Sequence, residues 1–142
     1  MIYSLGYQNL TPAKLARLVK RLDALLIDVR SSPRSRKPGF GGRQLEALLP
    51  GRYRHEPGLG GRAPIDLDRV RAIREAHDGA ARPNAILLCL EELPSDCHRH
   101  TAICRPHLPG ALHVLAGCCF SVEGIQRFMD SGELPEPVDY IV

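Results

Sequence analysis

The chain has 142 residues, of which 44% are hydrophobic and 25% charged, and its formal net charge is +3. These values are typical of one soluble globular domain that buries about two-thirds of its unfolded surface, so we expect a single domain over residues 1–142. No apolar run is long enough to cross a bilayer, and the first residues do not resemble a secretory signal. We therefore exclude membrane insertion and expect a cytoplasmic protein.

The first half of the chain alternates strand and helix patterns. Thr11 and Pro12 supply an N-cap and a first-turn proline for a helix, while residues 25–29 form a continuous apolar run typical of a parallel strand. Residues 31–42 are rich in glycine and proline and predict a loop. In chain order, we expect a strand over 1–5, a helix over 12–22, a strand over 25–29, a helix over 43–49 and a strand over 52–55.

The second half continues the alternation. The apolar run over 85–90 is the clearest buried strand, and Ser95 or Asp96 is a candidate N-cap for the helix that follows it. In chain order, we expect a helix over 66–81, a strand over 85–90, a helix ending near Cys104, a strand over 112–116 and a helix over 122–129.

This order of elements predicts an α/β fold with an open, mostly parallel sheet of about five strands covered by helices. In such sheets, ligands bind at the carboxyl ends of the strands. Polar residues stand at four predicted strand ends, so we expect them to share one edge of the sheet. They are Ser4 with Gly6, Asp28 with Arg30, His55, and Glu91.

Positive charge is concentrated in one block. Residues 30–62 contain eight Lys or Arg and two Glu, a local charge of +6, so the rest of the chain sums to −3. Such a block suggests an anionic partner, a phosphate-bearing small molecule or a nucleic acid, although a solvated arginine-rich loop is the alternative. The five cysteines are an odd number in a clustered arrangement, which predicts reduced thiols.

Several short motifs in a fixed order resemble a known family. They are SLG at 4–6, DVRSSPRSR at 28–36, PGF at 38–40, YRHEPGLGG at 53–61, and CLE with CHR between 89 and 99. From Tyr3 to about Ile103 the chain resembles the bacterial and archaeal family called domain of unknown function 488. The resemblance implies an α/β fold and no established chemistry. It points to these signature residues: Asp28, Arg30, Arg34, Ser35, His55, Gly60, Gly61, Cys89, Glu91, Cys97, His98 and Arg99.

Cys97 stands near the start of a predicted helix, where backbone N–H groups stabilise an anion and lower the pKa of a thiol. Arg99 adds to this effect. Cys97 is therefore a candidate nucleophile, with His98 or His55 as its acid or base. Alternatively, Cys97 is a small buried residue and Arg99 a structural ion-pair donor.

Cys89 ends a strand, as the cysteine does in rhodanese-type sulfurtransferases and cysteine phosphatases. Those enzymes need an anion-binding loop after the cysteine, whereas Leu90, Glu91 and Glu92 follow Cys89. Two carboxylates repel an anion. We therefore expect Cys89 to pack in the sheet.

Asp28 and Glu91 are candidate general acids, bases or nucleophiles, because each ends an apolar strand. The alternative is a structural network with Arg30 and Arg99. Guanidinium groups bind phosphate oxygens in pairs, and we expect the strand ends and the loop over 31–42 to hold the substrate. The candidate binding residues are Ser4, Gly6, Arg30, Arg34, Ser35, Arg36 and Arg99.

A metal site has to be weighed because Cys97, His98, His100, Cys104 and His107 lie within eleven positions. On a helix, Cys97 and His98 point to different faces, and a metal site with four ligands from these five residues would be strained. We therefore expect neither a metal nor another cofactor.

The leading hypothesis is an enzyme for a phosphate-bearing, nucleotide-related or nucleic-acid-related substrate at the carboxyl edge of the sheet. Its catalytic candidates are Asp28, His55, Glu91, Cys97 and His98. The alternative is a non-catalytic nucleic-acid-binding or interaction module that uses the basic block over 30–62, although few aromatic residues are available for stacking on bases.

Overall fold

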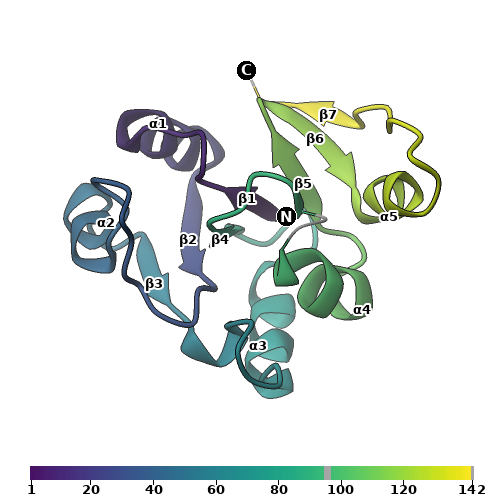
Figure 1. The fold of residues 1–142 in the computed structure, drawn as a ribbon. Helices are drawn as coiled ribbons and strands as arrows, with labels where there is room; N and C mark the ends of the chain where they lie inside the picture. Colours follow the sequence, from purple (N-terminus) through teal and green to yellow (C-terminus); the bar gives the residue numbers. More distant parts are fainter. Residues whose placement is uncertain (95–96, 142) are drawn as a thin grey trace.

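A seven-stranded sheet forms the centre of the computed structural model, which describes residues 1–94 and 97–141 (Figure 1). The strands lie in the order β3-β2-β4-β1-β5-β6-β7. They are β1 (Ile2–Gly6), β2 (Ala24–Asp28), β3 (Tyr53–His55), β4 (Asn84–Cys89), β5 (Leu112–Leu115), β6 (Cys118–Ser121) and β7 (Asp139–Tyr140). The helices are α1 (Pro12–Leu22), α2 (Gly42–Leu48), η1 (Pro57–Leu59), α3 (Leu67–His77), η3 (Arg99–Cys104), α4 (Arg105–His107) and α5 (Val122–Ser131).

The α/β class is confirmed, but the prediction of a mostly parallel sheet of about five strands is wrong in detail, because the sheet is mixed and has seven strands. The five predicted strands, β1 to β5, pair in parallel. The chain then reverses at Ala116 and Gly117, whose φ values are +49° and +81°, and β6 pairs antiparallel with β5. Two successive residues of positive φ are typical of a tight hairpin turn. β6 and β7 have four and two residues, which is too short for a clear alternation of side chains.

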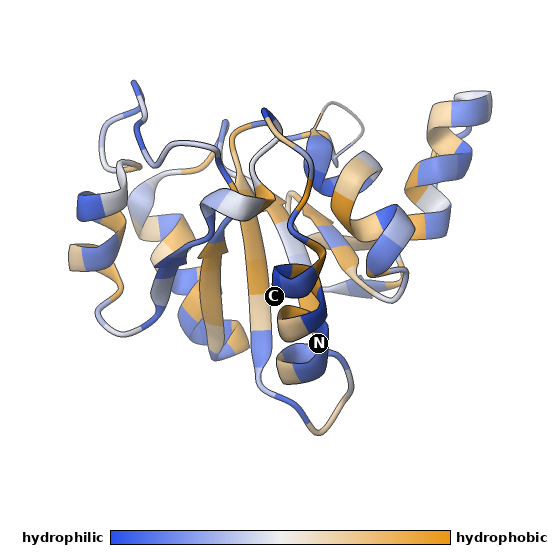
Figure 2. Cartoon of the chain, turned by 90° about the horizontal axis from the view of Figure 1, so that it is seen from below, coloured by the Kyte–Doolittle hydropathy of each residue, from blue (hydrophilic) through white to orange (hydrophobic). Residues whose placement is uncertain are grey.

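Side chains that alternate along the central strands build two separate cores. On β4, Ile86 and Leu88 pack in the core beneath α1 and α2, while Ala85, Leu87 and Cys89 pack in the core beneath α3 and η3. Figure 2 shows these central strands as the most hydrophobic part of the chain. Burial on both faces explains the continuous apolar pattern of β2 and β4.

The helix boundaries follow from their caps. The predicted helix over 12–22 is confirmed as α1, where the Thr11 hydroxyl accepts a hydrogen bond from Lys14 N (3.2 Å). α3 ends at His77, earlier than predicted, and Gly79 follows with φ +116°. The predicted cap at Ser95 or Asp96 lies outside the described residues.

The segment after β4 forms a π-helix, η3, which continues into α4. Single π-helical turns are frequent at functional sites. Within the described residues, no helix combines the length and the apolar character needed to span a membrane.

Candidate functional site

Asp28 of the 28–30 motif and Cys97 of the 97–99 motif lie on opposite faces of the sheet. On β2, Leu26 packs beneath α1 and α2, and Asp28, two residues later, points to the same side. Cys97 packs instead in the core beneath α3 and η3. Val29 joins the two motifs, because its side chain packs in the same core as Cys97 and its carbonyl lies 2.9 Å from His98 Nε2.

Asp28 is held by a buried, two-pronged ion pair with Arg30. Arg30 Nε donates to Asp28 Oδ1 (2.8 Å), and Arg30 Nη2 donates to Asp28 Oδ2 (2.6 Å). Tyr53 OH also donates to Asp28 Oδ2 (2.7 Å). The carboxylate is fully buried. In this structure Asp28 is therefore occupied by internal donors, as the structural alternative for this residue proposes.

The same guanidinium also lies against the ring of Tyr7. Tyr7 and Phe40 stack with their ring centres 4.6 Å apart, and Arg30 lies over the Tyr7 ring at 5.1 Å. Arg30 Nη1 donates to Tyr7 OH (3.0 Å) and to the Phe40 carbonyl (2.8 Å). Burial acts to lower the pKa of Arg30, but the hydrogen bond and charge of Asp28 outweigh it and raise the pKa. Burial, followed by the contact with Asp28, raises the pKa of Tyr53.

Arg99 is also fully buried, in the other core. Its Nε donates to Ser4 Oγ (2.6 Å), and its two terminal nitrogens donate to the carbonyls of Glu91 (2.6 Å) and Glu92 (3.0 Å). Arg99 thus fastens η3 to β1 and to the loop after β4. The expectation that Arg99 and Ser4 contact the substrate directly does not agree with this burial.

Two predicted glycines are required by close packing. A Cβ atom on Gly6 would lie 1.8 Å from the Glu91 carbonyl oxygen, and one on Gly60 would lie 2.5 Å from Ser31 Cα. The lack of a side chain at Gly6 is thus explained by its close packing against the loop after β4, and its role in substrate binding stays a prediction. Gly60 allows the loop after η1 to lie directly against the loop after β2.

Cys89, Cys97 and His98 form a compact cluster between β4 and η3. His98 Nδ1 lies 3.6 Å from Cys97 Sγ and 4.0 Å from Cys89 Sγ, and the three ligand atoms are all within 4.8 Å of one another. His98 Nε2 lies 2.9 Å from the Val29 carbonyl and 2.8 Å from the Leu59 carbonyl. Because a carbonyl only accepts, Nε2 carries a proton, and Nδ1 is the nitrogen that faces the thiols.

The surroundings of the two thiols shift their pKa values in opposite directions. The hydrogen bond from Cys89, together with His98 and Arg99, lowers the pKa of Cys97 despite its burial. The same hydrogen bond, and then burial, raises the pKa of Cys89. Burial acts to lower the pKa of His98, but the contact with Cys97 raises it. The shifts favour the ionised form of Cys97 and the protonated form of Cys89.

A cleft of about 490 Å³ opens at the carboxyl edge of the sheet and reaches this cluster. Its walls come from the loops after β1, β2 and β3, and its inner end includes Cys89 and His98. No carboxylate is found among the described residues that line it. The lining residues are Tyr7, Arg30, Ser31, Ser32, Arg34, Gly61, Arg62, Cys89, Leu90 and His98.

The cleft brings together only some of the predicted site residues. Arg30, Arg34 and His98 line it, and Cys97 lies directly behind His98. His55 Nε2 contacts the Arg30 carbonyl (2.6 Å) and lies outside the lining. Glu91 Oε2 accepts from Cys89 Sγ (3.4 Å).

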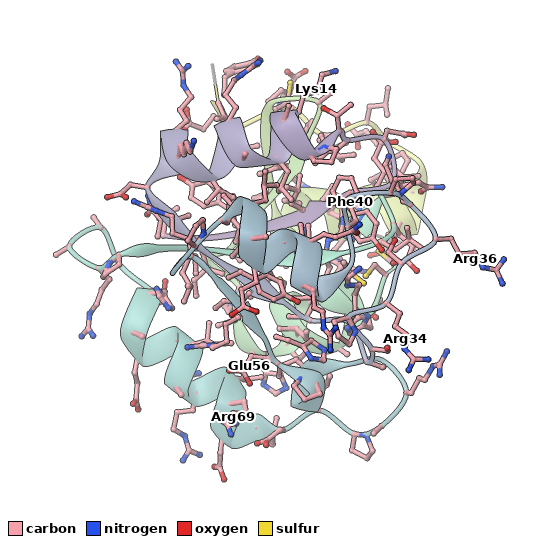
Figure 3. The ribbon with its side chains drawn as sticks, turned by 90° about the vertical axis from the view of Figure 1, so that its left-hand side faces the viewer. Lys14, Arg34, Arg36, Phe40, Glu56 and Arg69 are labelled. Carbon is pink, nitrogen blue, oxygen red and sulfur yellow. The ribbon has the colours of Figure 1, made fainter. Side chains whose placement is uncertain are left out.

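The loop over residues 31–42, called the basic loop below, carries three further predicted binding residues, and their side chains point in different directions. Arg34 and Arg36 extend away from the body of the protein, whereas Phe40 points inward (Figure 3). Of the two arginines, Arg34 lines the cleft. Ser35 Oγ accepts from Tyr7 OH (3.1 Å) and from Lys37 N (3.1 Å), so it orders the loop.

Sequence reasoning missed Cys89 and Arg62 as residues of the cleft. Cys89 does pack in the sheet, as expected, but its sulfur also faces His98. The alternation along β4 carries this signal, since it places Cys89 on the same face as Leu87, beneath η3. Arg62 belongs to the basic block but follows a glycine loop whose path only the tertiary structure shows.

Comparison with known protein families finds a similarity over part of the chain. The family model described as Domain of unknown function DUF488 matches residues 17–68, from α1 through the basic loop to the start of α3. The match covers 52 of the 142 residues, and over this segment the chain is similar to that family. No curated protein and no solved structure matches the chain.

Proposed function

We propose that this protein is an enzyme that binds a phosphate-bearing substrate, nucleotide-related or nucleic-acid-related, in the cleft at the carboxyl edge of the sheet. The observation that carries the proposal is the lining of the cleft. Three arginines, Arg30, Arg34 and Arg62, line one cavity with Cys89 and His98. Arginine at the mouth and a thiol–imidazole pair at the inner end suit an anion that is bound and then transformed.

The arginines have different roles in this proposal. Arg30 is neutralised by Asp28 and supports the cleft wall. Arg34 and Arg62 are exposed at the mouth and bind the phosphate. The Cys97–His98 pair supplies the chemistry, while Asp28 and His55 stabilise the loops that carry the arginines.

Binding is tested by calorimetry with pyrophosphate and a set of nucleoside monophosphates as probes. We expect the double variant Arg34→Ala, Arg62→Ala to weaken binding by at least about tenfold, because hydrogen bonds to charged groups each contribute about 1.5–3 kcal/mol. Arg71→Ala is the matched control, since Arg71 is an exposed arginine of α3 outside the cleft. Equal affinity in the double variant and the control contradicts the proposal.

Catalysis is tested separately from binding. Wild-type protein and Cys97→Ser are incubated with the same nucleotides and with short oligonucleotides, and mass spectrometry detects products. We expect conversion by the wild type alone, with similar substrate affinity in both proteins. Binding without conversion by the wild type favours the alternative, a non-catalytic binding module.

A further inference from the structure

We propose that Cys89, Cys97 and His98 bind a zinc-type divalent cation, with the fourth coordination position open toward the cleft. The cation site stands on the geometry of the three ligands. Only the role of its open position, which is to hold a substrate or a water, rests on the proposed function.

The spacing of the three side chains suits a tetrahedral centre. Zn–S bonds of about 2.3 Å and Zn–N bonds of about 2.0–2.1 Å place sulfur and nitrogen about 3.6 Å apart. The Cys97 Sγ–His98 Nδ1 distance is 3.6 Å, and the Cys89 Sγ–His98 Nδ1 distance is 4.0 Å. The two sulfur–nitrogen distances therefore need to close by at most a few tenths of an ångström around an ion, and the two sulfurs, which lie within 4.8 Å of each other, by at most about 1 Å.

The orientation of His98 is set by contacts outside the cluster. Its Nε2–H is held between the carbonyls of Val29 (2.9 Å) and Leu59 (2.8 Å), which leaves Nδ1 as the ligand atom. Metal-binding histidines usually donate their second nitrogen to a carbonyl or a carboxylate in this way. These two carbonyls come from the segments after β2 and within η1, so the ring is fixed before any ion arrives.

Burial and exposure of the ligands agree with a site that has one open position. Cys97 is 4% exposed and Cys89 6% exposed, and a cation that binds both sulfurs supplies the positive charge that two thiolates require in this core. Cys89 and His98 line the cleft, which gives an ion between them access to a substrate. Catalytic zinc sites commonly use three protein ligands in this manner.

The cysteines and histidines of η3 and α4 do not supply the rest of a site. His100 Nδ1 contacts His113 Nε2 (3.0 Å), and His100 Nε2 contacts Gln126 Oε1 (3.0 Å). Cys104 is fully buried in the core. The ligand that sequence spacing does not reveal is Cys89, eight residues before Cys97 and on β4.

The site is tested with the full chain, purified without added metal and kept reduced. Elemental analysis measures zinc per chain, and competition with a chromophoric chelator measures Zn²⁺ affinity after the metal has been removed. We expect one zinc per chain in the wild type. Cys89→Ser, Cys97→Ser and His98→Ala should each weaken binding by more than the roughly 10- to 100-fold loss caused by removing a supporting contact.

Three control variants sharpen the result. Cys118→Ser and His107→Gln, a thiol and an imidazole outside the cluster, should retain zinc. Glu91→Gln should also retain it, because the fourth position is open; its loss would show Glu91 to be the fourth ligand and would overturn the open site. A Co²⁺-loaded sample gives a second readout, since thiolate-to-cobalt absorption must disappear in Cys97→Ser.

The outcomes separate this inference from the proposed function. A reduced wild-type chain that binds no Zn²⁺, or binds it equally well in Cys97→Ser, overturns the cation site and leaves anion binding by Arg34 and Arg62 untouched. Zinc bound by the three ligands without any anion binding overturns the proposed function alone. Circular dichroism of each variant establishes that the chain is folded before its affinity is interpreted.

Discussion

At the scale of single residues, Asp28 illustrates how a strand-end carboxylate becomes structural. Its two oxygens receive Arg30 Nε, Arg30 Nη2 and Tyr53 OH, and the side chain has no exposure. Arg30 in turn holds the carbonyl of Phe40, so one ion pair connects β2 to the far end of the basic loop. These contacts hold the loop that carries Arg34 in place.

This arrangement predicts that Asp28→Asn is strongly destabilising. The substitution leaves a buried guanidinium without its counter-charge, a loss that typically costs about 3–5 kcal/mol. Urea denaturation measures the change in the free energy of unfolding. Asp23→Asn is the matched control, because the Asp23–Arg52 pair is exposed, and such pairs contribute about 0–1 kcal/mol. Similar losses in the two variants would mean that the Asp28–Arg30 pair has no special structural role.

At the scale of elements, a buried histidine pair joins β5 to η3 and α5. His113 and His100 have no exposure, and His113 Nδ1 is without a hydrogen-bond partner among the described residues. Burial, and then the charges of His100 and Arg99, lower the pKa of His113 to about 3. Burial likewise lowers the pKa of His100. His113 is therefore neutral in the folded protein well below the ordinary histidine pKa of about 6.5, and the pKa of His100 is shifted in the same direction.

The pair predicts acid sensitivity of the fold. A lowered pKa means that the unfolded chain binds more protons than the folded chain, so stability is present above about pH 6.5, the ordinary histidine value, and falls as the pH drops toward 3. The full slope is about 1.4 kcal/mol per pH unit for each histidine.

Urea midpoints measured between pH 7.5 and 4 test this prediction. His113→Asn should flatten the pH dependence, whereas His107→Gln, a substitution outside the pair, should leave it unchanged. The prediction fails if His113→Asn and the wild type lose stability in parallel over this range.

At the scale of the whole molecule, positive charge is concentrated in one segment of the chain. Residues 30–62 carry +6 and the remainder −3. Ion pairs within the described residues engage Arg30, Arg52 and Arg54 with carboxylates. Much of the remaining positive charge lies on the loops around the cleft mouth, where Arg34 extends into solvent (Figure 3).

This distribution predicts that anion binding in the cleft depends on salt. Exposed charges are screened at separations beyond about 8–10 Å at 0.1–0.15 M ionic strength. Pyrophosphate affinity, measured by calorimetry, should fall as sodium chloride is raised from about 0.05 to 0.5 M. Lys20→Ala, on the exposed side of α1, should preserve this salt dependence, and the Arg34, Arg62 double variant should reduce it. An affinity that is independent of salt would place the binding energy in uncharged contacts.

Much of the fold follows from local pattern. Apolar periodicity and the Thr11–Pro12 cap predict α1 correctly, and continuous apolar runs predict β2 and β4. The antiparallel strands β6 and β7 escape prediction because both are short and because β7 pairs with β6 across the intervening helix α5. For the same reason, sequence spacing groups Cys97 with other potential metal ligands of η3 and α4, whereas the fold places it next to Cys89.

The sequence by itself determined the alternation of strands and helices, the position of the basic block, and the polar residues at the strand ends. Only the tertiary structure decided which of these residues face the cleft. Asp28 and Arg99 have the charged side chains expected of site residues, yet both form hydrogen bonds inside the protein with residues distant in the chain. Asp28 accepts from Tyr53, and Arg99 donates to Ser4. The physical reason is that periodicity reports local burial, whereas the partner of a buried polar group depends on long-range packing.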